Sequence, residues 1–362
     1  MELSRKHIAV ICNYQLLDNR IGGMDYFFWA FNKKCLEAGI AIDWFFPNTA
    51  THGAYDTFTI IANAANISIE ASFINYIKHT TVNYTHVITH FVELCTSFYA
   101  EVKQLLDTKI IAVDHNPRPL GGYAIKKRLK KRVKGYLYGK HIDEFIGVSN
   151  YTSQAILKDF GSFLKSKTKT IYNGVLIEDI VPKTTTRAKT NPKFLVVSHL
   201  RFSKGIQDLI LAVSHLPQQI IKALNIDVFG DGPYKATLLQ LVSKHQLDGV
   251  FNFKGSCSSL NTRYQHYDYM LQPTHMECFS LSILESLAAN IPVITTSVGG
   301  NQEVVIHEKN GFIFKSKDVQ ALTALLQSVI TGKKQIKINT RKLIENQFSF
   351  ELMVENHFDL IK

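Results

Sequence analysis

Short apolar runs recur along the chain at intervals that predict parallel β-sheets. Each run is bounded by polar or glycine-containing residues, and helical segments separate most of them. Buried strands that alternate with helices are typical of parallel sheets covered on both faces. The expected strands are His7–Asn13, Ile40–Phe46, His86–His90, Ile110–Val113, Glu144–Val148, Thr170–Tyr172, Phe194–Val197, Ile226–Phe229, Val250–Phe253, Tyr269–Gln272 and Val293–Thr295.

One polar segment interrupts this pattern near the middle of the chain. Residues Pro182–Lys193 are rich in threonine, flanked by prolines and without an apolar period. We therefore predict an α/β protein of two doubly wound, Rossmann-like domains facing a central cleft. The first domain spans residues 1–181, a linker spans 182–192, and the second domain spans 193–348. A last helix, from about Ser349 to Leu360, follows the second domain.

Composition narrows the class of protein. The 362 residues suit two domains, and no apolar run approaches the roughly 20 residues that span a bilayer. The N-terminus leads straight into a strand, so we expect no signal peptide. Five scattered cysteines without a CxxC pair indicate a reducing cytosol. The net charge of +11 indicates an anionic partner.

Part of that charge lies in one predicted helix. No acidic residue occurs between His115 and Ile142, and Leu129, Val133 and Leu137 have the spacing of an apolar stripe. We predict that this helix binds an anionic membrane surface. Two alternatives stay open: a solvated helix packed by its stripe, and nucleic-acid binding, for which no recognition module is present. The cations are Lys126, Lys127, Arg128, Lys130, Lys131, Arg132 and Lys134.

The stretch from Gln272 to Gly300 carries the clearest candidate site. A buried strand ends there, a short loop follows, and a helix begins near Leu281. Ligands of open α/β sheets bind at this edge, and the N–H groups from Phe279 through Ser280 and Leu281 to Ser282 would face an anion. Glu277 lies in the loop and Glu285 in the helix. The pattern favours half of a nucleotide-sugar site, although Ser282-Ile-Leu-Glu285 also fits a capping box.

Two more loops at strand ends carry groups suited to phosphate. Arg201 and Lys204 follow the strand Phe194–Val197, where two cations could hold a departing diphosphate as a metal ion would. The adjacent glycines Gly22 and Gly23 open a helix and let backbone approach an anion, unless they form an ordinary turn. The pair Gly230 and Gly232 is a weaker signal, because the third glycine of a dinucleotide fingerprint is missing.

A histidine completes the candidate residues. His115 follows a strand of the first domain, where its imidazole could contact a sugar hydroxyl, accept a proton or simply be structural. His86 and His90 with Glu93 lie on a strand, which is not the geometry of a helical metal-ligand pair. No Asp-x-Asp pair is available for a divalent ion, and no G-x-S-x-G elbow indicates a hydrolase. We expect neither a metal nor a cofactor.

Taken in order, these segments resemble the retaining GT-B glycosyltransferases of family 4, also described as glycosyl transferases group 1. The resemblance covers nearly the whole chain. The matching segments are IGGMDYFFWAF, GVSNYTSQAILKDFG with KTIYNGV, HLRFSKGIQDLI, VFGDGPY, HMECFSLSILESLA, SVGGNQEVV, KNGFIF and QFSFELMVENHF.

The resemblance implies a role for each domain. The second domain would bind the nucleotide sugar and the first the acceptor, with residues 349–362 crossing back to the first. By resemblance, Glu285 would bind the ribose, Glu277 the donor sugar, and Lys204 the diphosphate. Backbone at Gly22-Gly23 and Phe279–Ser282 would complete the cradle, and His115 matches the acceptor-side histidine. Lys254 lies in the segment FNFKG, which would lie against the base.

The chain departs from the family at two positions. The usual arginine falls at or near His199, so we take Arg201, two residues later, as its substitute. A frequent glycine is Ser280 here, which can cap the helix.

The candidate residues and the resemblance together imply an enzyme that transfers a sugar from a UDP- or GDP-linked donor, with retention of configuration and without a metal. The expected acceptor is a lipid-linked saccharide or a growing surface polysaccharide, such as lipopolysaccharide or capsule. The expected location is the cytoplasm, at the inner face of the membrane. Two alternatives stay open: a nucleotide-sugar 2-epimerase of the same fold, and a non-enzymatic module that binds membrane or nucleic acid.

Overall fold

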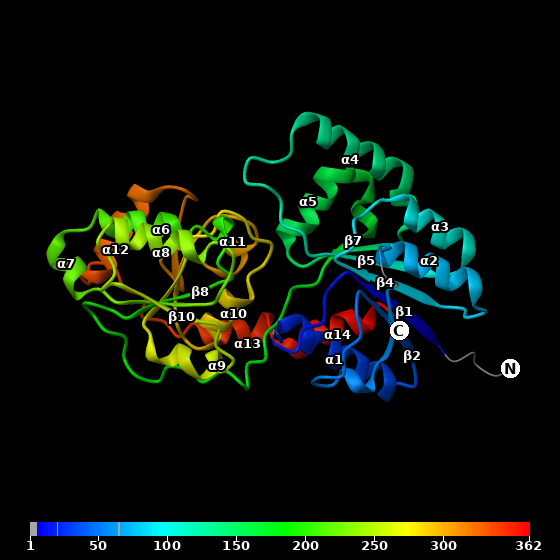
Figure 1. The fold of residues 1–362 in the computed structure, drawn as a ribbon, viewed down its shortest axis with the longest axis horizontal. Helices are drawn as coiled ribbons and strands as arrows, with labels where there is room; N and C mark the ends of the chain where they lie inside the picture. Colours follow the sequence, from blue (N-terminus) through cyan, green and yellow to red (C-terminus); the bar gives the residue numbers. More distant parts are fainter. Residues whose placement is uncertain (1–5, 20, 64–65) are drawn as a thin grey trace. The chain divides into compact units, whose positions relative to one another are not determined.

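The protein consists of two compact units. The computed structural model describes residues 6–19, 21–63 and 66–362 (Figure 1). The first unit contains the residues up to Pro117, Gly121–Asn173 and Glu351–Lys362. The second contains Arg118–Leu120 and Gly174–Phe350.

The described residues of the first unit form a parallel sheet of seven strands in the order β3-β2-β1-β4-β5-β6-β7. The order reverses direction between β1 and β4, as in doubly wound sheets. The strands are β1 (His7–Cys12), β2 (Ala41–Phe46), β3 (Thr59–Ala62), β4 (His86–His90), β5 (Lys109–Asp114), β6 (Glu144–Gly147) and β7 (Thr168–Thr170). The strand β3 was not expected from the sequence. It lies at the sheet edge and its residues are only partly buried, so its apolar pattern is weak.

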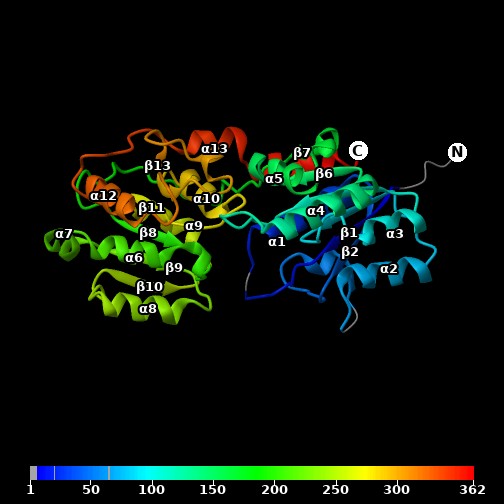
Figure 2. The same ribbon diagram turned by 90° about the horizontal axis from the view of Figure 1, so that it is seen from above.

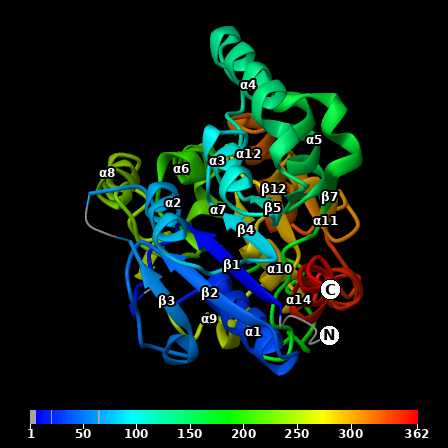
Figure 3. The same ribbon diagram turned by 90° about the vertical axis from the view of Figure 1, so that its right-hand side faces the viewer.

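Helices cover both faces of this sheet. Figures 1 and 3 show α1 and α14 on one face and α2 and α3 on the other. Apolar residues of α2, α3 and α5 form one core with the strands. The helices are α1 (Gly23–Glu37), α2 (Ile69–His79), α3 (Ser97–Leu105), α4 (Ile125–Tyr138), α5 (Asn150–Phe160) and α14 (Phe350–Asp359), with short 3-10 turns at Tyr55–Thr57, Gly139–His141 and Ser162–Lys167.

The described residues of the second unit form a parallel sheet of six strands in the order β10-β9-β8-β11-β12-β13. Figure 2 shows β10, β9, β8, β11 and β13 in this order. The order again reverses, between β8 and β11, which places the loops after these two strands beside each other. The strands are β8 (Phe194–Val197), β9 (Ile226–Phe229), β10 (Phe251–Gly255), β11 (Tyr269–Gln272), β12 (Val293–Thr296) and β13 (Gly311–Phe314).

The helices of the second unit also lie on both sides of its sheet. Figure 1 shows α6, α8 and α12 on one side and α9, α10 and α13 on the other. Residues of α6, α8 and α12 form a continuous apolar core with the strands. The helical segments are η4 (Phe202–Lys204), α6 (Ile206–Ser214), α7 (Gln218–Ala223), α8 (Lys235–Lys244), α9 (Leu260–Arg263), η5 (Tyr264–His266), α10 (Leu281–Ala288), α11 (Asn301–Val304), α12 (Val319–Ile330) and α13 (Arg341–Gln347).

The expected linker, residues 182–192, is part of the second unit in the structure. The backbone N–H of Lys183 donates to Ala289 O at 2.8 Å, and that of Asn191 donates to Ile330 O at 3.0 Å. Arg187 donates to the backbone and side-chain oxygens of Asn290 at 2.7 and 2.8 Å. A polar segment can therefore be held by hydrogen bonds without any apolar period. The units instead divide after Asn173.

The last helix, α14, belongs to the first unit although it follows the second in sequence. His357 packs edge-on against Phe27 of α1, with ring centroids 4.8 Å apart. Lys34 of α1 pairs with Glu355, and Lys109 donates to Leu360 O at 3.2 Å. The chain therefore returns to its first unit, as the final helix was expected to do.

Candidate functional site

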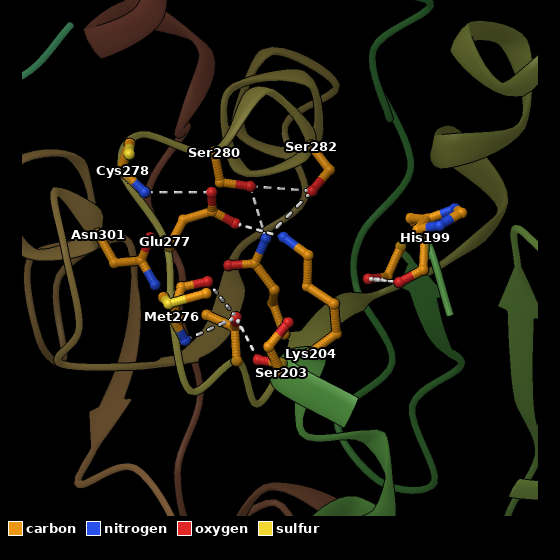
Figure 4. Close-up of polar contacts among 12 residues, drawn as sticks. His199, Ser203, Lys204, Met276, Glu277, Cys278, Ser280, Ser282 and Asn301 are labelled. Atoms are coloured by element: carbon orange, nitrogen blue, oxygen red, sulfur yellow. Dashed lines mark hydrogen bonds and ion pairs between the residues drawn. The ribbon is translucent and has the colours of Figure 1, made fainter. Parts of the chain in front are cut away.

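An ion pair joins the two loops that follow β8 and β11. The ammonium nitrogen of Lys204 lies 2.8 Å from Glu277 Oε2. Figure 4 shows the two side chains pointing toward each other, beside Ser280 and Ser282 at the start of α10. The side chains are 25% and 16% exposed, so both charges are partly shielded yet remain accessible. The structure thus brings together two predicted site residues that are far apart in sequence.

Two glycines with positive φ allow these loops to approach. At Gly205 (φ +70°) a Cβ atom would lie 1.9 Å from Pro273 O, and at Gly299 (φ +59°) it would lie 2.0 Å from Glu277 O. No side chain fits at either position, and L-residues rarely adopt such φ values. These glycines therefore set the backbone positions on which the Lys204–Glu277 pair depends.

Polar contacts also tie the two loops together. The N–H of His275 donates to Ser203 O at 2.7 Å, and Thr274 Oγ1 donates to the same oxygen at 3.2 Å. The buried ring of His275 places Nε2 2.6 Å from Asp208 Oδ2 on α6. The sequence did not identify His275 or Asp208, because a pair formed between two elements leaves no local motif.

The N-terminus of α10 is left without a side-chain cap. Ser280 is the N-cap residue and makes no capping hydrogen bond. Its hydroxyl instead contacts Gln272 Nε2 and lies 3.1 Å from Ser282 Oγ. Phe279 is buried and its ring contacts Phe348, so its side chain is not available to a ligand. The helix dipole and the absence of a side-chain cap from Ser280 favour an anion at this end of α10.

Glu285 is held by a tyrosine and not by a capping box. Its Oε2 accepts a hydrogen bond from the hydroxyl of Tyr264 at 2.8 Å. Burial raises the pKa of Glu285 to about 7, and the Tyr264 hydrogen bond opposes this shift in part. A carboxylate held one turn inside α10 can accept hydrogen bonds from hydroxyl groups of a ligand.

The residues at the family's arginine position lie on the surface. His199 and Arg201 are both exposed, and the His199 side chain points away from the Lys204–Glu277 pair (Figure 4). His199 contributes, after larger effects from Gly232 and Lys235, to holding the pKa of Asp231 below its usual value. That Arg201 takes the family role therefore stays a prediction.

Gly230 and Gly232 serve packing between the loops after β8 and β9. Added Cβ atoms would lie 1.9 Å from Ser198 O and 2.5 Å from Leu200 O. The N–H of Gly230 donates to Gly255 O at 2.8 Å, and that of Gly232 donates to Asp231 Oδ1 at 2.7 Å. Both amides therefore have acceptors within the unit, and a donor-binding role for this pair stays a prediction.

Lys254 lies at the end of β10, about half exposed. Its ammonium is 3.6 Å from Asp227 Oδ1 on β9. Tyr267 also donates to Asp227, through Oδ2 at 2.7 Å. The sequence prediction that this segment lies against a base has neither support nor contradiction from these contacts.

In the first unit, Gly22 and Gly23 begin α1 as expected. Asp25 is fully buried and accepts hydrogen bonds from the Gly22 N–H at 2.9 Å and from the Tyr55 hydroxyl at 2.7 Å. The Gly22 amide is therefore occupied by Asp25. An added Cβ at Gly22 would meet no atom within 4 Å, so this turn borders open space.

His115 is partly buried and lies beside the buried histidines His90 and His357. His90 Nδ1 lies 3.0 Å from His115 Nε2, and the His357 ring lies 6.2 Å from that of His90. Burial lowers the pKa of His115 to about 3 and that of His357 to about 4. Neutral imidazoles of this kind can exchange hydrogen bonds with a hydroxyl, but His115 is a weak proton acceptor near neutral pH.

The apolar stripe of the cationic helix α4 faces solvent and does not pack on the sheet. Gly135 is its only buried residue, and it packs so closely on α5 that a Cβ there would lie 2.0 Å from Phe160 O. Lys131 pairs with Asp159 at 3.1 Å and Lys134 with Glu93 at 2.7 Å. Figure 3 shows α4 extending beyond α3 and α5. The apolar residues are exposed: Ile125 (74%), Leu129 (62%), Val133 (56%), Tyr136 (77%) and Leu137 (48%).

Outside residues 1–5, 20 and 64–65, no group of three His, Cys, Asp or Glu side chains could hold a metal ion. In the same described part, no helix is long and apolar enough to cross a bilayer.

Two Rossmann-like units with parallel sheets define the GT-B fold, and comparison with solved structures agrees. Sucrose-phosphate synthase of Thermosynechococcus elongatus superimposes with a TM-score of 0.76 at 20% identity, over 99% of this chain and 98% of that chain. Alr3699/HepE of Anabaena, solved with UDP and glucose, gives a TM-score of 0.72 at 16% identity over 99% of both chains.

A family match covers most of the second unit. Residues 178–347 match the family described as glycosyl transferases group 1. The chain is also 30% identical to glycogen synthase of Mycobacterium tuberculosis over 147 residues, which are 40% of this chain and 35% of the synthase. The match thus spans about a third of the length of that relative.

Proposed function

We propose that the protein transfers a sugar from a nucleoside diphosphate to a hydroxyl acceptor, with retention of configuration and without a metal ion. The observation that carries this proposal is the Lys204–Glu277 pair beside the uncapped N-terminus of α10. A cation and a helix N-terminus suit a diphosphate, and a neighbouring carboxylate suits the hydroxyls of a sugar. The second unit would bind the donor and the first unit the acceptor.

Each side chain would have a defined part in the reaction. Lys204, with Arg201, binds the diphosphate and stabilises the charge that develops on the departing β-phosphate. Glu277 orients the donor sugar, and Glu285 binds the ribose. The bond from the anomeric carbon to the phosphate oxygen breaks, and the acceptor oxygen attacks on the same face. The acceptor proton passes to the departing phosphate, so no side chain has to accept it.

His115 would contact the acceptor without removing its proton. Its pKa is lowered to about 3 by burial, so its basicity is poorly matched to proton abstraction near neutral pH. Assigning the proton to the phosphate oxygen agrees with this property. His115 then positions the acceptor through a hydrogen bond to one of its hydroxyl groups.

We propose a lipid-linked saccharide or a surface polysaccharide as acceptor, approached at an anionic membrane through α4. The exposed apolar residues of α4 lie on a helix with cations and no acids, the composition of interfacial helices. Lys131 and Lys134 form ion pairs within the unit, Arg132 donates to Lys158 O, and Lys127 lies over the Tyr123 ring. This leaves the exposed Lys126, Arg128 and Lys130 for phosphate headgroups. The enzyme would then act as a peripheral protein at the inner face of the membrane.

A panel of UDP-, GDP- and ADP-sugars, measured for thermal stabilisation, tests the donor class. A binding donor raises the melting temperature by mass action, and the panel identifies the base and the sugar. Incubating that donor with and without saccharide acceptors then separates transfer from epimerisation, because an epimerase converts the donor alone. Stabilisation by none of the donors would contradict the proposal.

A further inference from the structure

A buried tyrosine holds the carboxylate that the proposed function assigns to the ribose. Tyr264 begins η5 and its side chain has no exposed surface. Its hydroxyl donates to Glu285 Oε2 at 2.8 Å. Burial and the neighbouring carboxylate raise the pKa of Tyr264 well above its ordinary value, so this hydroxyl stays protonated and remains a donor.

Tyr264 is the polar group that acts on Glu285. Helix α10 packs against α13 and α11, whose charged groups include Arg341, Glu345 and Glu303. Arg341 is engaged by Glu345 at 2.8 Å and by Ala288 O at 2.9 Å. Burial raises the pKa of Glu285, and the hydrogen bond from Tyr264 opposes this shift.

We propose that Tyr264 is a positioning residue for nucleotide binding, which fixes one carboxylate oxygen of Glu285 so that the other accepts hydrogen bonds from the ribose hydroxyls. This inference rests on the proposed function. A protonated carboxyl group loses acceptor capacity, so ribose binding should weaken as pH falls through the pKa of Glu285. By donating to the ionised form, Tyr264 keeps that pKa lower than burial alone would set it.

The substitution Tyr264→Phe removes the hydroxyl and keeps the ring, so the buried volume is preserved. The dissociation constants of UDP and GDP, and of their 2′,3′-dideoxy analogues, would be measured by calorimetry from about pH 5.5 to 8.5. The dideoxy ligands carry the same phosphates and no ribose hydroxyls. They therefore separate the titration of Glu285 from that of the ligand phosphates.

We expect the variant to bind the ribose form about tenfold more weakly at neutral pH. Its pH midpoint should rise by about one unit. The dideoxy form should bind equally well to both proteins. As a control, Tyr269→Phe removes another buried hydroxyl of the same unit, which accepts from the Ile336 N–H at 3.1 Å. This control should lower stability without moving the pH midpoint.

Three outcomes are distinguishable. If ribose and dideoxy ligands lose affinity equally in Tyr264→Phe, the tyrosine merely supports the fold and the inference is wrong. If the midpoint of the ribose form does not move, Tyr264 does not act through Glu285. If the unmodified protein binds neither UDP nor GDP at any pH and no nucleotide sugar of the panel stabilises it, the proposed function itself fails.

Discussion

The ammonium nitrogen of Lys204 lies 2.8 Å from Glu277 Oε2, although the two residues are 73 positions apart in the chain. One follows β8 and the other β11, which are neighbouring strands at the point where the sheet order reverses. Close backbone contacts at Gly205 and Gly299 hold both loops. A cation and a carboxylate are therefore presented together at the edge where open α/β sheets bind ligands.

Lys204→Ala should lower turnover by roughly one to three decades. A cation near a phosphate oxygen is worth about 4 kcal/mol at an effective dielectric of 20, and each 1.4 kcal/mol changes a rate about tenfold. Steady-state kinetics with the identified donor measures the effect. Lys334→Ala is the matched control, because Lys334 pairs with Glu308 on the surface of the same unit and should be silent. Unchanged turnover in Lys204→Ala would remove Lys204 from the site.

Glu277→Ala should abolish transfer while the affinity for the nucleoside diphosphate stays within a few-fold. The carboxylate is assigned to the sugar and not to the nucleotide, so its loss affects the positioning of the anomeric carbon. Product formation and calorimetry with the nucleotide measure the two properties separately. A combined loss of transfer, affinity and thermal stability would instead indicate that Glu277 holds the fold.

Glu285→Gln should make the second unit more stable, and increasingly so as pH rises from about 4.5 to 7. Burial raises the pKa of Glu285 to about 7, so the folded state keeps a proton that the unfolded state releases. The free energy of unfolding of the unmodified protein therefore falls by up to roughly 3 kcal/mol across this interval. Denaturant titrations at several pH values measure the difference. A constant difference between the two proteins would contradict the raised pKa.

The exposed apolar residues of α4 should be required for membrane binding. Leu129→Ser combined with Val133→Ser removes apolar surface that makes no core contact, so flotation with anionic liposomes should decrease while stability is kept. Leu239→Ser, at an exposed leucine of α8, is the control.

Lys126→Gln with Lys130→Gln should weaken binding to the same liposomes by roughly tenfold or more, since each cation near the surface contributes about 1 kcal/mol. Lys131 and Lys134 are unsuitable targets because they pair within the unit. If all variants float equally, or if the unmodified protein does not float at low salt, α4 is a solvated surface helix and does not bind membranes.

The local pattern of the chain was enough to predict most of the strands and the doubly wound α/β class. Buried parallel strands are short continuous apolar runs, so they can be read without knowledge of their neighbours. Edge strand β3 was missed because its residues are only partly buried, and the short edge strand β13 was missed although most of its residues are buried. The segment after Pro182 was taken for a linker because hydrogen bonds to distant backbone leave no periodic pattern.

The sequence by itself determined which residues carry the candidate chemistry, since Lys204, Glu277 and Glu285 follow strands or begin helices in recognisable local motifs. Only the tertiary structure decided what each of them touches. In the structure Lys204 forms an ion pair with Glu277, and Glu285 accepts a hydrogen bond from Tyr264 and takes no part in a capping box. The close approach of Gly135 to α5 leaves the apolar residues of α4 exposed. The reason is physical: strand and helix signals arise within a few residues, whereas these contacts join elements that only sheet order and close backbone packing bring together.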